Sequence, residues 1–370
     1  MKIMHWVGID DHADKWTIAH FIADAQEPAN VFELIPDAKG YRRLIAFLKG
    51  LGKNVRVAYE AGPCGFDLYR RLTKAKIDCK VAAPSLTPTK PGERVKTNRK
   101  DAKKIARCHR SGDLTYVTVP DEQQESLRDL IRQRASVKRD VGRTQRQIIQ
   151  MLLRYGHRYR EGKSWTQRFW SWLRKVRLEG AHSQFVLDEN VGELEHRIEQ
   201  LKRFDQEIAE AARQPEYATY VNALRVLRGI ETLSAMTLLS ELGDLRRFAS
   251  APQMMAAVGL VPGESSTGDK TNRLSITKTG NAHVRHIAVE AAWHYQRGAK
   301  PGRTIRARRV GQPPEVVAIA EKCDKRLSTK FYRLTSRRKK STVAAVAVAR
   351  ELIGFIWAIG QKIHPGTISR

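Results

Sequence analysis

The chain has few cysteines for its length. Its four cysteines (Cys64, Cys79, Cys108 and Cys323) are scattered among 370 residues, and no two of them form a CxxC pair. This spacing excludes a disulfide framework and the usual zinc motifs, and it fits a reducing compartment. No apolar segment precedes Asp10, so we expect no secretory signal.

Acidic residues are also scarce. The chain contains 39 Asp and Glu residues against 67 Lys and Arg residues, a formal charge of +28. An excess of this size predicts a partner rich in phosphate, because counterion release drives basic proteins onto nucleic acids. The alternative is a basic surface that only keeps the protein soluble. The basic residues cluster around candidate catalytic carboxylates, which favours nucleic acid.

Long apolar runs without charge are absent as well. The most apolar stretch, residues 341–360, is interrupted by Arg350 and Glu351. A membrane-spanning helix rarely carries two charges at its centre, so this stretch predicts a buried core helix. We expect no membrane association and a cytoplasmic, nucleoid-associated protein.

The first 110 residues show the patterns of alternating strands and helices. Period-two and apolar runs predict strands, and the recurrence of Tyr41, Leu44, Ile45 and Leu48 predicts a helical face. The resulting order β-β-β-α-β-α-β-α is that of the ribonuclease H-like fold. The expected strands cover residues 3–10, 15–23, 30–35, 55–60 and 78–84, and the last helix carries Asp101.

Two long helices follow, separated by an aromatic and basic segment around Trp165 and Trp170. The first has the three-and-four spacing of a coiled-coil seam, and the second repeats it. Together they predict a helical hairpin, which could be an intramolecular bundle or could also dimerise. From about residue 220 we expect helices again, then a loop and three helices to residue 361. The two seams consist of Leu127, Leu130, Arg134, Val137, Val141, Thr144, Ile148 and Met151, and of Val191, Leu194, Ile198, Leu201 and Ile208.

Carboxylates stand at the ends of predicted elements. Asp10 closes the first strand, Glu60 closes the fourth, and Asp101 lies on the helix that follows the fifth. Carboxyl ends of neighbouring parallel strands meet at one edge of a sheet, where hard divalent cations could bind. Each residue alone could be an ordinary turn or helix-end carboxylate. Their combination predicts metal-assisted cleavage of a phosphate backbone.

Asn98 precedes Asp101 by three residues and shares its helical face. Its amide oxygen can bind a cation but brings no negative charge. The same segment is strongly basic, and this charge would attract a phosphate backbone. The basic residues that we expect to contact nucleic acid here are Lys96, Arg99, Lys100, Lys103 and Lys104.

A second candidate site lies in residues 259–285. Ser265, Ser266 and Thr267 stand between Pro262 and Gly268, where the backbone can turn and expose a hydroxyl. A serine beside cations can attack a phosphodiester and form a phosphoserine intermediate. Lys278 and Arg285 follow, and we expect both to contact nucleic acid.

These motifs resemble those of the transposases of insertion-sequence family one-ten, the DEDD, bridge-RNA-guided transposases or serine recombinases. The resemblance covers nearly the whole chain. It rests on GID, YEAG, VKTNRKDA, RGIETLSAMTLLSELGD, GLVPGESSTG, SITKTGNAHVR and AVAVARELIGFIWAI.

The resemblance implies an α/β plus all-α architecture. Residues 1–115 would form a RuvC-like (RNase H fold) DEDD domain, 116–215 a coiled-coil dimerisation linker, and 216–370 a helical transposase domain with a catalytic serine loop. The ligands of Mg²⁺, for which Mn²⁺ could substitute, would be Asp10, Glu60, Asn98 and Asp101, with Ser266 as nucleophile.

The implied partners are a structured bridge RNA and donor and target double-stranded DNA. A homodimer would assemble to a tetramer, with each active site built from two protomers. Two features depart from the family pattern. Asn98 replaces the usual Asp, and SSTG replaces shorter motifs, so Ser265 is the second choice of nucleophile and Thr267 the third.

Two other functions fit parts of the pattern. A RuvC-like junction nuclease that uses water as nucleophile needs the carboxylates but not the serine loop. A non-catalytic nucleic-acid-binding relative would have lost metal binding through Asn98.

Overall fold

The computed structural model describes residues 3–88, 97–266 and 272–363. It divides into two compact units, residues 1–120 and 121–370. The division of the chain into three domains at residues 115 and 215 stays a prediction.

The first unit contains a five-stranded mixed sheet in the order β3-β2-β1-β4-β5. β1 pairs antiparallel with β2 and parallel with β4, and β4 pairs parallel with β5. The predicted order of strands and helices is confirmed. The elements are β1 (His5–Asp11), β2 (Trp16–Ile22), β3 (Asn30–Leu34), α1 (Ala38–Gly50), β4 (Val55–Glu60), α2 (Asp67–Lys74), β5 (Asp78–Ala82), η1 (Pro84–Leu86) and α3 (Asn98–Ser111).

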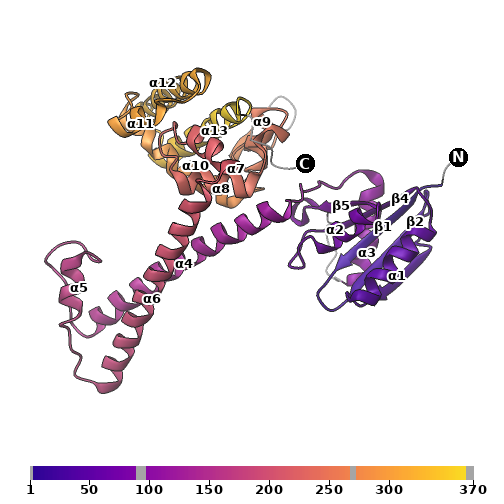
Figure 1. Ribbon diagram of the computed structural model, residues 1–370, viewed down its shortest axis with the longest axis horizontal. Helices are drawn as coiled ribbons and strands as arrows, with labels where there is room; N and C mark the ends of the chain where they lie inside the picture. Colours follow the sequence, from indigo (N-terminus) through magenta and orange to yellow (C-terminus); the bar gives the residue numbers. More distant parts are fainter. Residues whose placement is uncertain (1–2, 89–96, 267–271, 364–370) are drawn as a thin grey trace. The chain divides into compact units, whose positions relative to one another are not determined.

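Helices cover both faces of this sheet (Figure 1). On one face, Val7 and Ile9 of β1 pack with Leu44 of α1 and Leu72 of α2. The other face takes α3, whose small residues let the helix approach closely. A Cβ on Gly8 would lie 2.2 Å from the carbonyl oxygen of Ala102, so only glycine fits there.

The second unit begins with a helical hairpin. Helices α4 (Glu122–Arg154) and α6 (Ala181–Ala211) run side by side, and α5 (Gln167–Leu173) lies between them in sequence at the far end of the hairpin (Figure 1). Apolar side chains of all three pack together, Phe169 and Leu173 among them. The predicted hairpin is thus observed within one chain, whereas a coiled-coil supercoil stays a prediction.

The buried seam differs in detail from the predicted one. Ile131 is buried, while Arg134 is partly exposed and pairs with Asp205 on α6 at 2.8 Å. A charged residue in the seam can therefore form an ion pair with the other helix of the hairpin. Leu187, Leu194 and Ile208 are the buried residues of α6.

The rest of the second unit is a helical body around one apolar core. Between residues 282 and 363, the last that the structure describes, there are four α-helices rather than three, and the expected loop contains a β-hairpin. The elements are α7 (Pro215–Leu224), α8 (Thr232–Leu242), η2 (Leu245–Arg247), α9 (Ala251–Ala257), β6 (Pro262–Glu264), β7 (Arg273–Ile276), α10 (Ala282–Ala292), η3 (Trp293–Arg297), α11 (Arg303–Arg309), α12 (Pro314–Ser336) and α13 (Ser341–Gly360).

Helix α13 is long and apolar enough to cross a membrane by length and composition. In the second unit, however, Val348, Leu352 and Ile356 of this helix are fully buried in the core. Glu351 accepts hydrogen bonds from Arg326 and Lys330 of α12. This packing is that of a core helix, as the interrupting charges predicted.

Candidate functional site

Asp10 and Glu60 are neighbours across the sheet. β1 and β4 are parallel with Ile9 opposite Tyr59, so the next residues, Asp10 and Glu60, come opposite each other at the carboxyl ends of both strands. Side chains alternate along a strand. Asp10 therefore shares the face of Gly8, which is the face that α3 covers.

Helix α3 runs antiparallel to β1. The His109 ring near its end lies 5.1 Å from Trp6, whereas Ala102 near its start contacts Gly8. The first turn, which contains Asn98 and Asp101, is thus directed toward the Asp10 end of the strand. All four predicted ligands are half-buried.

The local sequence explains how α3 begins there. Thr97 is the N-cap, and its hydroxyl accepts a hydrogen bond from the Lys100 backbone N–H at 3.3 Å. Arg99 lies 3.9 Å from Glu33, whose strand partner Thr17 pairs with Asp10. The pair places Arg99, in the first turn of α3, near the level of Asp10 on the sheet.

Three carboxylates do not converge at this edge. Among the residues that the structure describes, no three His, Cys, Asp or Glu side chains form a group that could hold a metal ion. The oxygen donors match the preference of Mg²⁺, and two of them stand opposite each other on adjacent strands. The oxygen donors therefore fit a divalent cation in chemistry, but within the described residues the structure opposes only Asp10 and Glu60, and Asp101 of α3 does not complete a group of three with them.

Asp11 faces the opposite side of the sheet. Its carboxylate accepts a hydrogen bond from the Trp16 indole at 2.7 Å. Burial raises the pKa of Asp11, although the Trp16 hydrogen bond lowers it in part. This hydrogen bond to a buried tryptophan engages Asp11 on the other face of the sheet, while the choice of Asp10 as ligand stays a prediction.

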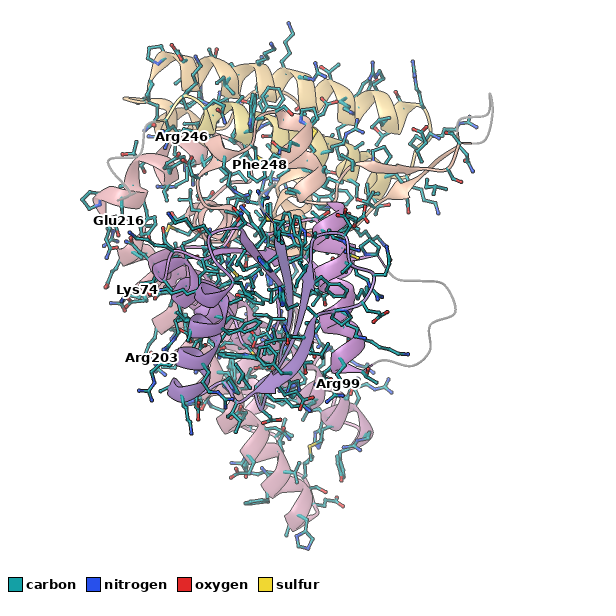
Figure 2. The ribbon with its side chains drawn as sticks, turned by 90° about the vertical axis from the view of Figure 1, so that its right-hand side faces the viewer. Lys74, Arg99, Arg203, Glu216, Arg246 and Phe248 are labelled. Atoms are coloured by element: carbon teal, nitrogen blue, oxygen red, sulfur yellow. The ribbon has the colours of Figure 1, made fainter. Side chains whose placement is uncertain are left out.

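The predicted basic contacts of α3 are partly engaged within the first unit. Arg99, labelled in Figure 2, keeps 69% of its side chain exposed beside Glu33. Lys103 pairs with Glu27 at 3.3 Å. Lys100 is exposed and Lys104 is half-buried. Lys96 lies outside the described residues, so its predicted contact has no structural account.

The candidate serine stands at the tip of the β6–β7 hairpin. The Ser265 N–H donates to the Asn272 carbonyl at 2.9 Å, which continues the ladder past β6. Both Ser265 and Ser266 are exposed. Thr267, the third choice, lies outside the described residues.

The Ser266 hydroxyl donates a hydrogen bond to a carboxylate oxygen of Glu264 at 2.7 Å. A carboxylate at this distance can accept the proton of an attacking hydroxyl. Sequence reasoning named no general base. The signal that could have found one is the spacing in Glu-Ser-Ser, because a residue two positions away on an extended chain faces the same side.

Close backbone contacts fix the base of this hairpin. Gly259 has φ +70°, and a Cβ there would lie 2.1 Å from the Thr279 carbonyl oxygen. Gly280 has φ +96° and approaches the Ala257 carbonyl equally closely. Lys278 is exposed with a left-handed φ of 56°. The Arg285 guanidinium donates to the Val258 carbonyl at 2.8 Å, so it also holds the hairpin base.

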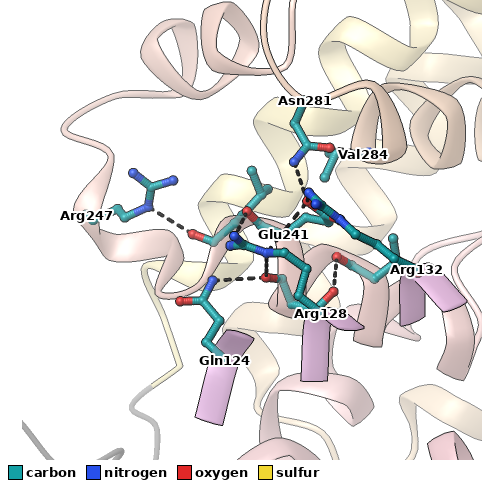
Figure 3. Close-up of polar contacts among 10 residues, drawn as sticks. Gln124, Arg128, Arg132, Glu241, Arg247, Asn281 and Val284 are labelled. Atoms are coloured by element: carbon teal, nitrogen blue, oxygen red, sulfur yellow. Dashed lines mark hydrogen bonds and ion pairs between the residues drawn. The ribbon is translucent and has the colours of Figure 1, made fainter. Parts of the chain in front are cut away.

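A polar network supports the same base from within the helical body (Figure 3). The Glu241 side chain is 1% exposed and accepts two hydrogen bonds from Arg132 of α4, at 2.7 and 2.9 Å. Asn281, the N-cap of α10, donates to Glu241 at 2.7 Å. Sequence reasoning missed this network because its members are far apart in the chain.

Electrostatics keep this buried carboxylate charged. Burial raises the pKa of Glu241, but the hydrogen bonds from Arg132 and Asn281 and the positive charge of the neighbouring arginines outweigh it and hold the pKa below the ordinary value. Arg128 adds a further cation 3.9 Å away. The network connects α4, α8 and α10. Helix α10 begins directly after the β6–β7 hairpin, so the network lies where the chain leaves that hairpin.

Comparison with known proteins identifies the class of protein to which the chain belongs. Residues 7–157 match the family model of the DEDD transposases of the IS110 type, described as transposase. Residues 221–305 match a second model, described as the transposase IS116/IS110/IS902 family. The chain is an insertion-sequence transposase.

Individual relatives agree. The chain is 41% identical to the putative transposase y4qE of Sinorhizobium fredii (strain NBRC 101917 / NGR234) over 89% of its own length and 81% of that protein. It is 31% identical to the transposase for insertion sequence element IS1533 of Leptospira borgpetersenii, over 92% of its own length and 99% of that protein. The chain belongs to the IS110 family of transposases.

Proposed function

We propose that this protein is an RNA-guided DNA transposase that joins donor and target DNA through a covalent phosphoserine at Ser266. The observation that carries the proposal is the position of Ser266. It is exposed at the tip of a β-hairpin, and its hydroxyl is hydrogen-bonded to Glu264. A hydroxyl in this setting can reach a phosphate and transfer its proton.

We also propose that the first unit is an RNase H/RuvC-like domain that binds Mg²⁺, with Mn²⁺ as a substitute. The strand order and the opposed Asp10 and Glu60 support this assignment. Asp10, Glu60, Asn98 and Asp101 would hold the ion. When bound, it would polarise the scissile phosphate and stabilise negative charge on its oxygens.

The chain's own residues perform the transfer. Ser266 Oγ attacks the phosphorus while Glu264 accepts its proton, and the bond from phosphorus to the 3′ oxygen breaks. The departing 3′ oxygen takes a proton and becomes a hydroxyl. In the second step, the 3′-hydroxyl of the other duplex attacks the phosphoserine, and Ser266 recovers its proton. Lys278 and Arg285 would neutralise charge on the phosphate oxygens.

The partners follow from the charge and the resemblance. A bridge RNA would select donor and target duplexes by base pairing, and the protein would bind their backbones through its +28 charge. A homodimer that assembles to a tetramer would hold both duplexes. These partners would place the protein on the nucleoid in the cytoplasm.

The test is a denaturing gel of labelled donor and target DNA incubated with the protein, Mg²⁺ and RNA transcribed from the flanks of its gene. We expect a protein-linked DNA band that Ser266→Ala removes and Ser265→Ala retains. Cleavage that persists in Ser266→Ala without a linked band would instead indicate water as nucleophile. Absence of cleavage in both the natural chain and Asn98→Asp would leave nucleic-acid binding alone.

A further inference from the structure

A second basic surface lies on α12, away from the residues assigned so far. A groove of about 460 Å³ runs along α12 and is closed on one side by α13. The cations that line it come from α12, and Glu351 comes from α13. The lining cations are Lys322, Lys325, Arg326, Lys330 and Arg333.

The pattern of α12 separates this surface from the core. Cys323, Leu327 and Phe331 are buried against the helical body. The cations recur at three- and four-residue steps on the outer face, where side chains of one helical stripe meet. Packing does not explain Lys322, Lys325 or Arg333, which are exposed, whereas Lys330 is only 15% exposed beside Glu351.

The charge of the groove is mostly unbalanced. Glu351 pairs with Arg326 and Lys330. Within the described part of the chain, no acidic partner is found for Lys322, Lys325 or Arg333, and all three are exposed. The connection from α12 to α13 continues the charge with exposed Arg337, Arg338, Lys339 and Lys340.

An aromatic side chain stands beside this stripe. Tyr332 is 74% exposed, and it lies seven residues, or about two turns, after Lys325 on the same side of α12. Unpaired bases stack on exposed aromatic rings, and neighbouring cations bind the phosphates. Lys322 and Arg333 are separated by about 16 Å along the helix axis, enough to follow several nucleotides of one strand.

We propose that the α12 groove binds a sugar-phosphate backbone and that Tyr332 stacks on an unpaired base. The phosphate chemistry is shared by RNA and DNA. The exposed tyrosine favours a strand with unpaired bases over a regular duplex. The proposal concerns binding and does not depend on Ser266 or on the metal ligands.

The test compares two full-length double variants with equal charge change. Lys322→Glu with Lys325→Glu alters the groove, and Lys49→Glu with Lys53→Glu alters two exposed lysines near the end of α1. Affinity for a labelled single-stranded RNA is measured from 50 to 300 mM salt. Two lost phosphate contacts should lower the slope of log K against log salt by about 1.4 in the groove variant only.

Equal affinities and equal slopes for both double variants would overturn the proposal. Repeating the titration with single-stranded DNA and with duplex DNA identifies the source of the phosphates. Tyr332→Ala should weaken single-stranded binding roughly tenfold at an unchanged salt slope, while Tyr332→Phe should bind as the natural chain does. If Tyr332→Ala bound the single-stranded RNA as tightly as the natural chain, Tyr332 would not stack on a base.

Measuring strand cleavage together with RNA binding distinguishes this proposal from the proposed function. A Ser266→Ala variant should keep the groove-dependent salt slope although it forms no protein-linked DNA. If the natural chain forms no such link but the groove variant still loses slope, the phosphoserine proposal fails and the groove stands.

Discussion

Asp10 and Asp11 are adjacent in the chain and yet face opposite sides of one sheet. Asp10 shares the α3 face with Gly8, whereas Asp11 is hydrogen-bonded to Trp16 among the residues of the other face. At the scale of the residue, strand alternation therefore separates a candidate ligand from a structural carboxylate. The same alternation places Ser266 and Glu264 on one side of the hairpin.

The two aspartates make a matched pair of variants. We expect Asp10→Asn to lower Mg²⁺-dependent strand cleavage at least about a hundredfold, because one charged ligand is lost. Asp11→Asn should keep cleavage, since an amide oxygen can still accept the Trp16 hydrogen bond. Because burial raises the Asp11 pKa, its charge costs folding free energy above pH 4, so the melting temperature of Asp11→Asn at pH 7 should not fall. Equal activities of the two variants would contradict the assignment.

Glu264 is the second residue-scale prediction. Glu264→Gln keeps the size and an oxygen acceptor but cannot take a proton, so the rate of phosphoserine formation should fall roughly 10²–10⁴-fold. The rate of Glu264→Gln should also recover as pH rises, because hydroxide can then take the serine proton in place of the lost base. The measurement is single-turnover formation of the linked band from pH 5 to 9. A pH profile identical to that of the natural chain would reduce Glu264 to a positioning role.

At the scale of the element, the approach of α3 to β1 depends on Gly8. A Cβ there would meet backbone atoms of Ala102 and Ala106 that cannot move independently of the helix. We expect Gly8→Ala to cost about 2–3 kcal/mol of stability and to reduce cleavage, because α3 carries Asp101. Gly50→Ala is the control, since nothing lies within 4 Å of the added Cβ. Denaturant unfolding of the full chain measures both, and equal midpoints would argue against tight packing at Gly8.

The Glu241 network gives a prediction for the second unit. Glu241→Ala leaves Arg132 and Arg128 without their carboxylate, and we expect a loss of about 3 kcal/mol. Glu193→Ala removes an exposed pair with Arg197 and should cost less than about 0.5 kcal/mol. Because the Glu241 pKa is lowered, its contribution is present above pH 4.5 and is lost as pH falls below that value. Similar losses in the two variants would show that the network adds little.

Sequence patterns and structure agree best where local periodicity decides the element. Helix α1 was predictable because its buried residues Leu44 and Leu48 recur with the helical period, whereas residues 7–9 of β1 are all buried because helices cover both faces of the sheet. The β6–β7 hairpin was missed because its strands are three and four residues long, and their apolar content is low. Contacts such as Glu241 with Arg132 join residues 109 positions apart, and no local pattern encodes them.

At the scale of the whole molecule, the two candidate halves of the active site lie in separate compact units. If each site takes its metal ligands from one protomer and its serine from another, two inactive variants can complement each other. A mixture of Asp10→Asn and Ser266→Ala should regain up to about a quarter of natural activity, as random subunit mixing allows one intact combination. Mixtures as inactive as their components, despite proven subunit exchange, would show that each site is built within one chain.

Because the partners of Glu241 lie far from it in the sequence, the network can form only after all of them have been synthesised. Arg132 leaves the ribosome long before Glu241, but Asn281 follows Glu241 by 40 residues. At a synthesis rate of about 5–20 residues per second, Asn281, the last donor to be made, emerges several seconds after Glu241. Ribosome-bound chains arrested ahead of Asn281 should accordingly be cut by protease more readily than those arrested once α10 is exposed.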